Sequence, residues 1–320
     1  MAYNHWFVSR QKRQLTTILP ALIAFSDVCV GKKWAGNTAL QLAFEDELQR
    51  RDITEHGKLR ARKQNQGGGG TRTLFKQMKD LGLVFTEDDN GKCRLTLIAE
   101  AIIKGDITFV EAMRLQLQKY QYPSAACWSG SGAVCRSFKV HPFQFILRLL
   151  RYTPLGNYLT NDELAYIVIH QANSDDDETF NNVSGLILAH RKDGSLPFSI
   201  IDQVCITDEM TAEQAKAIKV TQTAYQNIAN TFCNYLSLTQ YIDRGYKQIS
   251  IRSGKEQEVD AFIQAKPTYI PSPELNENYI RAYGRGNAAK DLRNFEREDR
   301  KTTKELNEAR IRKEYVLLAL

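Results

Sequence analysis

One stretch of the chain combines residue types that bind polyanions. Between Lys58 and Lys79, seven side chains are basic and none is acidic, and four consecutive glycines, Gly67 to Gly70, interrupt the run. Lysine and arginine neutralise phosphates, and backbone amides of a loop can hold them. The stretch therefore predicts a contact with nucleic acid, and the alternative is a solvated surface that happens to be basic.

The positive charge of the chain is localised. The formal net charge of the 320 residues is +6, whereas residues 1–80 carry fourteen Lys/Arg against seven Asp/Glu and are +7 by themselves. A basic region in an otherwise balanced chain is typical of a local polyanion contact. The length predicts two or three domains. No apolar run approaches the roughly 20 residues that span a bilayer, so we expect a cytoplasmic protein.

Catalytic chemistry has no comparable signal, and we predict no catalytic residue, no metal ligand and no cofactor in this chain. A metal-dependent nuclease needs clustered carboxylates and a lysine around its ions. The nearest fragment joins Asp260 to Lys266, a spacing too short for adjacent strands. The six cysteines lack the two- to four-residue spacing of zinc ligands, which indicates a reduced compartment without a zinc site.

The element that must position the basic side chains is a short amphipathic helix after the glycines. At about 100° per residue, three of its cations share an arc of about 60°: Arg72, Lys76 and Lys79. The opposite side carries four apolar side chains: Leu74, Phe75, Met78 and Leu81. We expect Thr71 to cap the start of this helix and Gly82 to end it.

Two short strands follow this helix, and the layout recurs later in the chain. The first pair, residues 83–85 and 93–97, is joined across a strong turn signal at Asp88–Gly91. A second helix over 213–238 precedes strands at 240–243 and 248–251, joined around Arg244 and Gly245. Helix, tight turn and hairpin form a winged helix. We therefore predict a mainly α fold with short β-hairpins (α+β) and two winged-helix units.

Such helices read DNA in the major groove, where Arg pairs with guanine and Gln or Asn with adenine. Two dissimilar units would read two different half-sites, so we expect a double-stranded DNA partner with an asymmetric site. The predicted DNA contacts lie in the N-terminal segment, the basic loop and the two helices: Arg10, Lys12, Arg13, Arg60, Arg62, Lys63, Thr71, Arg72, Thr73, Lys76, Lys79, Lys219, Thr221, Thr223 and Gln226.

Composition divides the chain into three parts. Residues 1–140 are expected to form a first winged-helix recognition subdomain and residues 141–266 a second one. From Pro267 onward, prolines and a mixed-charge segment predict a linker and a charged helix over 267–320.

An ordered set of segments resembles the AlwI-type family of type IIS restriction and nicking endonucleases. The segments are Trp6–Ser9, Trp34, Thr71–Phe85, Tyr120–Ser124, Pro142–Leu150 and Leu159–Ala165. The resemblance implies an N-terminal DNA-recognition region of winged-helix character, followed by a linker and a metal-dependent nuclease domain. That domain would use Mg²⁺ and hydrolyse a phosphodiester a few base pairs to one side of a short asymmetric site.

The chain departs from that plan, since it ends about where the linker begins and the nuclease carboxylates are not found. We therefore expect the recognition part of a type IIS restriction or nicking endonuclease, whose nuclease domain is missing from this chain. A separate nuclease domain or subunit would then be a second partner. Two alternatives stay open, namely a complete endonuclease with an unrecognised metal-dependent site and a non-enzymatic winged-helix regulator.

Overall fold

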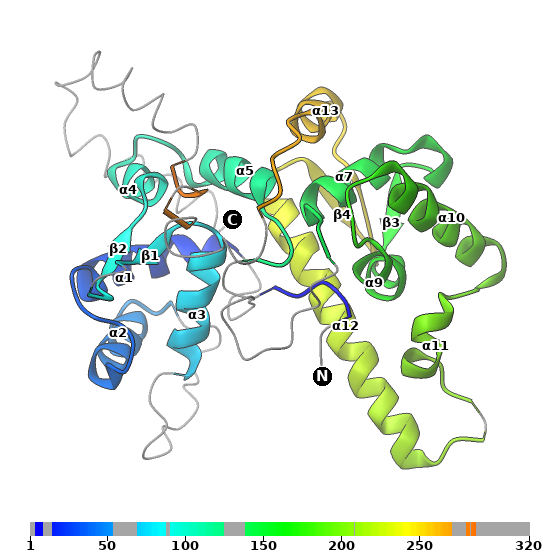
Figure 1. Ribbon diagram of the computed structural model, residues 1–320, viewed down its shortest axis with the longest axis horizontal. Coiled ribbons are helices and arrows are strands. Elements are labelled where there is room, and N and C mark those ends of the chain that lie inside the picture. Colours follow the sequence, from blue (N-terminus) through cyan, green and yellow to red (C-terminus); the bar gives the residue numbers. More distant parts are fainter. Residues whose placement is uncertain are drawn as a thin grey trace. The chain divides into compact units, whose positions relative to one another are not determined.

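The protein is described here by a computed structural model covering residues 4–8, 15–53, 69–87, 90–124, 138–207, 209–270, 280–281 and 283–285. The chain forms two compact units, which we name after their principal helices. The α3 unit holds residues 9–117 and 270–320, and the α12 unit holds residues 1–8 and 118–269. Both are mainly helical with a small antiparallel sheet (Figure 1), which confirms the predicted α+β class.

The division of the chain into the parts 1–140, 141–266 and 267–320 stays a prediction.

None of the described helices combines the length and the apolar character that crossing a bilayer requires.

The α3 unit begins with helices and continues into a hairpin. Its described elements are η1 (Leu15–Thr17), α1 (Ile18–Cys29), α2 (Thr38–Arg50), α3 (Gly69–Asp80), β1 (Val84–Thr86), β2 (Cys93–Leu95), α4 (Leu97–Lys104) and α5 (Phe109–Lys119), which continues into the other unit. β1 and β2 are antiparallel, with Val84 opposite Leu95, so the first predicted hairpin is confirmed.

A buried aromatic cluster holds α3 against α1 and α2. The Phe75 ring stacks on Trp34, with 4.5 Å between the ring centres, and on Phe25, with 5.5 Å. Phe44 of α2 meets Phe25 edge-on at 5.5 Å. Burying one such ring contributes roughly 1.5–3 kcal/mol, and aromatic pairing adds to this. The cluster therefore fixes which face of α3 points away from the core.

The two ends of α3 differ in how well they were predicted. The helix begins at Gly69, so Thr71 lies inside the first turn with 3% of its surface exposed, and its prediction as the capping residue is wrong. The predicted end of α3 at Gly82 is confirmed. Gly82 has φ +66°, its amide donates to the Lys79 carbonyl, and the Leu83 amide donates to the Met78 carbonyl. This pair of bonds is the Schellman motif, which favours glycine at the left-handed position.

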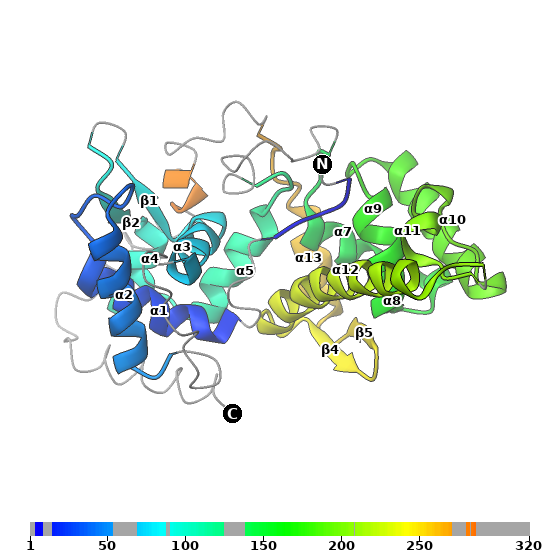
Figure 2. The same cartoon turned by 90° about the horizontal axis from the view of Figure 1, so that it is seen from below.

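The α12 unit packs short elements around one long helix (Figure 2). Its described elements are α7 (Pro142–Arg151), η2 (Thr153–Leu155), β3 (Tyr158–Thr160), α8 (Asn161–Glu163), the π-helical η3 (Leu164–Val168), α9 (Ile169–Gln171), α10 (Asp177–Asp193), α11 (Phe198–Val204), α12 (Ala212–Leu238), β4 (Ile242–Gly245), β5 (Gln248–Ile251) and α13 (Glu256–Gln264). The sheet order is β3-β5-β4, and both pairs are antiparallel.

The second predicted hairpin is present, with two differences. β4 runs through Gly245, so the turn lies at Tyr246 and Lys247 (φ +58°) and not at Arg244–Gly245. In addition, β3 pairs with the free edge of β5 and makes the sheet three-stranded. A three-residue strand far away in the sequence gives too short a pattern to be predicted.

Side-chain caps fix where α10 and α12 begin. Thr211 accepts a hydrogen bond from the Gln214 amide, and Gln214 accepts one from the Thr211 amide, which closes a capping box at α12. In the acidic run before α10, Asp176 accepts a hydrogen bond from the Thr179 amide at 2.7 Å. The run therefore caps this helix.

The segment of residues 4–8 is built into the core of the α12 unit. The Trp6 side chain is fully buried, and its indole N–H donates to the Ala172 carbonyl at 2.7 Å. The ring also packs edge-on against Phe145 and Phe232. Residues 4–8 are thus anchored against residues that lie far from them in the sequence.

Candidate nucleic-acid interface

The first candidate surface lies on α3 and comprises Arg72, Thr73, Lys76 and Lys79; we call it the α3 surface. Arg72 and Lys76 are exposed, whereas Thr73 and Lys79 are half-buried. The Lys79 ammonium lies 5.7 Å from the centre of the Phe75 ring. The four apolar residues predicted for the opposite side are all buried, which confirms the two-faced helix.

Arg72 and Lys76 of the α3 surface differ from Arg51 and Arg94 of the same unit. Arg51 pairs with Glu47 at 2.5 Å, and Arg94 pairs with Glu87 at 2.6 Å. In the described part of the chain, no carboxylate pairs with Arg72 or Lys76. Their charge is therefore available to an anionic partner.

Other predicted contacts of the basic segments cannot be placed. Six of them lie outside the described residues: Arg10, Lys12, Arg13, Arg60, Arg62 and Lys63. Thr71 is described but buried, so its side chain is not presented at the surface. Their contact with DNA stays a prediction.

The second candidate surface is a row of polar side chains on α12, comprising Thr223, Gln226, Asn227, Asn230 and Asn234; we call it the α12 strip. At about 100° per residue, these positions and Lys219 share an arc of about 100°. The opposite side of α12 is buried in the core through residues such as Phe232, which is fully buried. The strip therefore faces away from the core of its unit.

Three of the four contacts predicted on α12 lie on this side of the helix. Lys219, Thr223 and Gln226 are exposed, and the Thr223 hydroxyl donates to the Lys219 carbonyl at 2.8 Å. Thr221 differs, since it is half-buried, points toward the side of the core residues, and donates to the Ala217 carbonyl at 3.2 Å.

Sequence reasoning did not assign the three asparagines of the strip as contacts. Thr223, Asn227, Asn230 and Asn234 are spaced by four, three and four residues. This spacing places polar side chains on one face of a helix, so the sequence periodicity could have identified these asparagines as part of the strip.

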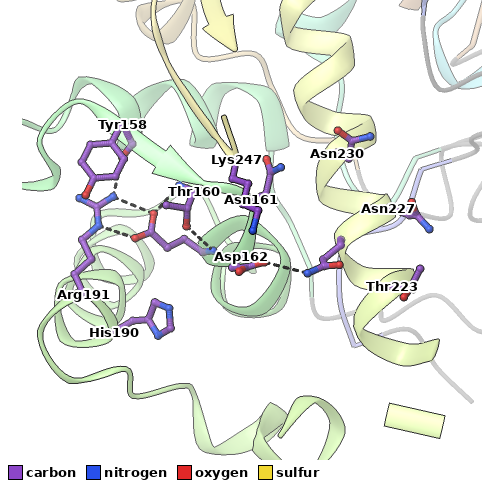
Figure 3. A pocket seen from close by; sticks show the side chains of 12 residues that line it. Tyr158, Thr160, Asn161, Asp162, His190, Arg191, Thr223, Asn227, Asn230 and Lys247 are labelled. Atoms are coloured by element: carbon purple, nitrogen blue, oxygen red, sulfur yellow. Dashed lines mark hydrogen bonds and ion pairs between the residues drawn. The ribbon is translucent and has the colours of Figure 1, made fainter. Parts of the chain in front are cut away.

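A pocket of about 680 Å³ opens beside the α12 strip (Figure 3). Every side chain that lines it is polar or charged: Tyr158, Thr160, Asn161, Asp162, Glu163, His190, Arg191, Thr223, Gln226, Asn227, Asn230 and Lys247. Pockets for small organic ligands are mostly apolar. A polar lining instead suits a hydrated, hydrogen-bonding partner such as nucleic acid.

The wall of the pocket opposite α12 is fixed by an ion pair between the half-buried Arg191 and the buried Glu163. Arg191 Nε lies 2.6 Å from Glu163 Oε1, and Arg191 Nη2 lies 2.9 Å from Glu163 Oε2. Arg191 also donates to the Tyr158 carbonyl and lies 4.0 Å above the centre of that ring. Glu163 is 2% exposed and also accepts a hydrogen bond from the Thr160 amide. Because both side chains of the pair are bonded to groups of the protein, we expect them to hold this side of the pocket in place and not to contact DNA.

The hairpin β4–β5 brings further cations to the C-terminal part of the strip. Arg244 donates to the side-chain oxygens of Asn230, at 2.7 Å, and of Asn234. At the turn, Tyr246 is 87% exposed, and the Lys247 ammonium lies 5.3 Å from its ring centre. Sequence reasoning missed these residues because their neighbours are set by the tertiary fold.

The one fragment considered for metal chemistry has a structural role. Asp260 lies on α13 and accepts two hydrogen bonds from Arg151, at 2.7 and 2.8 Å. Across the described ranges, no group of three or more His, Cys, Asp or Glu side chains is arranged to hold a metal ion.

Comparisons with known proteins agree with the mixed helical architecture. A crystal structure of the BpuJ1 endonuclease binding domain, in complex with pyrene- and phenanthrene-modified DNA, superposes with a TM-score of 0.53. It is 13% identical in sequence, and the match covers 84% of this chain and 90% of that one, a likeness that shows the fold alone. No curated protein matches. The family model described as AlwI restriction endonuclease matches residues 79–312. The chain therefore belongs to the AlwI restriction endonuclease family.

Proposed function

We propose that this chain recognises double-stranded DNA in a sequence-specific manner, as the recognition part of a type IIS restriction or nicking endonuclease in the cytoplasm. The observation that carries the proposal is the α3 surface. Its aromatic cluster fixes one face of α3 in the core, and Arg72 and Lys76 lie on the other face without a carboxylate partner among the described residues. A helix with this charge pattern suits the major groove and its flanking phosphates.

The proposed units are two winged helices. In the first, α1, α2 and α3 precede the hairpin β1–β2, and α3 is the recognition helix. In the second, α12 precedes the hairpin β4–β5, and the α12 strip is its reading face. Because the two faces carry different side chains, we propose that the target site is asymmetric.

Membership of the AlwI restriction endonuclease family supports this proposal. The neighbouring BpuJ1 endonuclease binding domain, which was crystallised with DNA, supports duplex DNA as the partner. We propose that phosphodiester hydrolysis beside the site is the task of a separate nuclease domain or subunit. Mg²⁺ bound there would stabilise the charge that develops at the scissile phosphate. The residues of this chain bind and orient the duplex.

Two experiments test the proposal. Electrophoretic mobility shift with a random pool of 40-base-pair duplexes should show a retained fraction, and repeated selection should enrich one sequence. Incubation of the purified chain with plasmid and Mg²⁺ should leave supercoiled DNA intact. A discrete nicked or linear product would favour a complete endonuclease. Specific binding without a functional link to any nuclease would favour a transcriptional regulator, and no binding at all would refute DNA recognition.

A further inference from the structure

The guanidinium of Arg244 is held in an unusual way. Arg244 lies on β4, one of the two edge strands of the sheet, and its side chain reaches the C-terminal part of the α12 strip. Nη2 donates to Asn230 Oδ1 at 2.7 Å, and Nη1 donates to Asn234 Oδ1. The side chain is nevertheless exposed. The guanidinium is thus fixed in place while remaining accessible.

The other arginines described in the α12 unit are neutralised by carboxylates. Their pairs are Arg148 with Asp177, Arg151 with Asp260, Arg191 with Glu163 and Arg252 with Asp243. Within the described residues of this unit, only Arg244 rests on neutral amides instead. Two fixed hydrogen bonds therefore orient a cation whose charge is not offset by a paired acid.

The hydrogen-bonding character of this cluster follows from its chemistry. A guanidinium has five N–H donors and no acceptor, so each asparagine must turn its oxygen toward Arg244 and its NH₂ group away. Two of the five donors are used, which leaves three. The groups that the guanidinium offers to a partner are therefore donors. On duplex DNA, adjacent pairs of acceptor atoms are found on the phosphates and at O6 and N7 of guanine in the major groove.

We propose that Arg244, oriented by Asn230 and Asn234, binds a pair of acceptor atoms on the duplex, from either a phosphate or the major-groove edge of guanine. The inference rests on the proposed function and assigns a contact to a hairpin residue. Asn230 and Asn234 act as positioning residues. Their hydrogen bonds hold the guanidinium in one geometry before DNA arrives, so less side-chain freedom is lost on binding.

Substitution of Arg244 by glutamine tests the contact, and Arg252→Gln is the matched control. Arg252 is half-buried, belongs to the same unit and pairs with Asp243. Both variants lose one positive charge. Binding of the full chain is measured against a random 40-base-pair duplex pool and against the selected sequence, over a range of salt concentrations. Circular dichroism confirms that each variant is folded.

Loss of a phosphate contact should weaken binding to both duplexes about eightfold at 0.1 M salt and lower the salt slope by about 0.9. Loss of a guanine contact should weaken binding to the selected duplex roughly 5- to 150-fold and relax the preference at one G·C pair. Arg244→Lys separates the two, since lysine retains a phosphate contact but cannot form the bidentate pair with guanine. Arg252→Gln should bind like the unaltered protein.

The positioning role has its own test. Asn234→Asp supplies a carboxylate that neutralises Arg244, so it should weaken binding as much as Arg244→Gln does. Asn234→Ala keeps the free charge, so binding should weaken less and the salt slope should stay unchanged. Equal binding by Arg244→Gln and the unaltered protein overturns the contact, and unchanged binding by both Asn234 variants overturns the positioning role. If the unaltered protein binds no duplex, the proposed function itself is refuted.

Discussion

Replacing Arg72 and Lys76 with glutamine removes two exposed cations from α3 and leaves its buried face intact. Each phosphate contact contributes about 0.9 to the slope of log K against log salt, so two contacts contribute about 1.8. Relative to 1 M salt, where this electrostatic contribution vanishes, that slope corresponds at 0.1 M to roughly a 60-fold loss of affinity, about 2.5 kcal/mol. The stability of the fold should be unaffected because neither side chain has a carboxylate partner in the described structure.

Fluorescence anisotropy with a labelled duplex between about 50 and 200 mM salt measures both the affinity and the slope. The control replaces Arg50 and Lys104 with glutamine, which changes the net charge by the same amount in the same unit. Arg50 lies 2.6 Å from Glu47, and Lys104 lies 3.9 Å from Glu100, so their charges are already compensated. An unchanged slope in the α3 variant, or an equal loss in the control, would refute the assignment of the α3 surface.

Three predictions concern stability. Gly82→Ala should lower the thermal midpoint, since Gly82 has φ +66° and a Cβ atom would lie 2.5 Å from Tyr283 Cδ1, a clash and strain that cost roughly 1–3 kcal/mol. Glu163→Ala should cost about 3–5 kcal/mol in urea denaturation, because Arg191 is left without its buried partner. Burial lowers the pKa of His170 to about 3, so the unfolded chain binds this proton more readily, and stability should be lost as the pH falls from about 6.5 toward 3. In His170→Gln, the loss between pH 7 and pH 5 should be smaller by about 2 kcal/mol, and an equal loss would contradict this cause.

The features of α3 that depend on neighbouring residues in the chain could be predicted from the sequence. The 100° spacing of α3 separated its cations from its apolar residues, and the glycine at position 82 marked its end. The start of α3 was misplaced, because Thr71 is a good capping residue but its side chain is buried by tertiary packing, which overrides the local preference.

The α12 strip could be predicted only in part from the sequence. Lys219, Thr223 and Gln226 could be placed on one face of a helix from periodicity alone. The hydrogen bond from Arg244 to Asn234 could not be predicted, because it depends on how the hairpin β4–β5 packs against α12. Strand β3 was missed for the same reason, since its partner β5 lies far along the chain.

Selection of bound sequences from a random duplex DNA pool is the most direct test of sequence-specific recognition by this chain. We expect the enriched sequences to share one short asymmetric motif, and the Arg72→Gln, Lys76→Gln variant to lose that enrichment. Failure to enrich any sequence would contradict specific recognition, and enrichment of a palindrome would contradict reading by two dissimilar units.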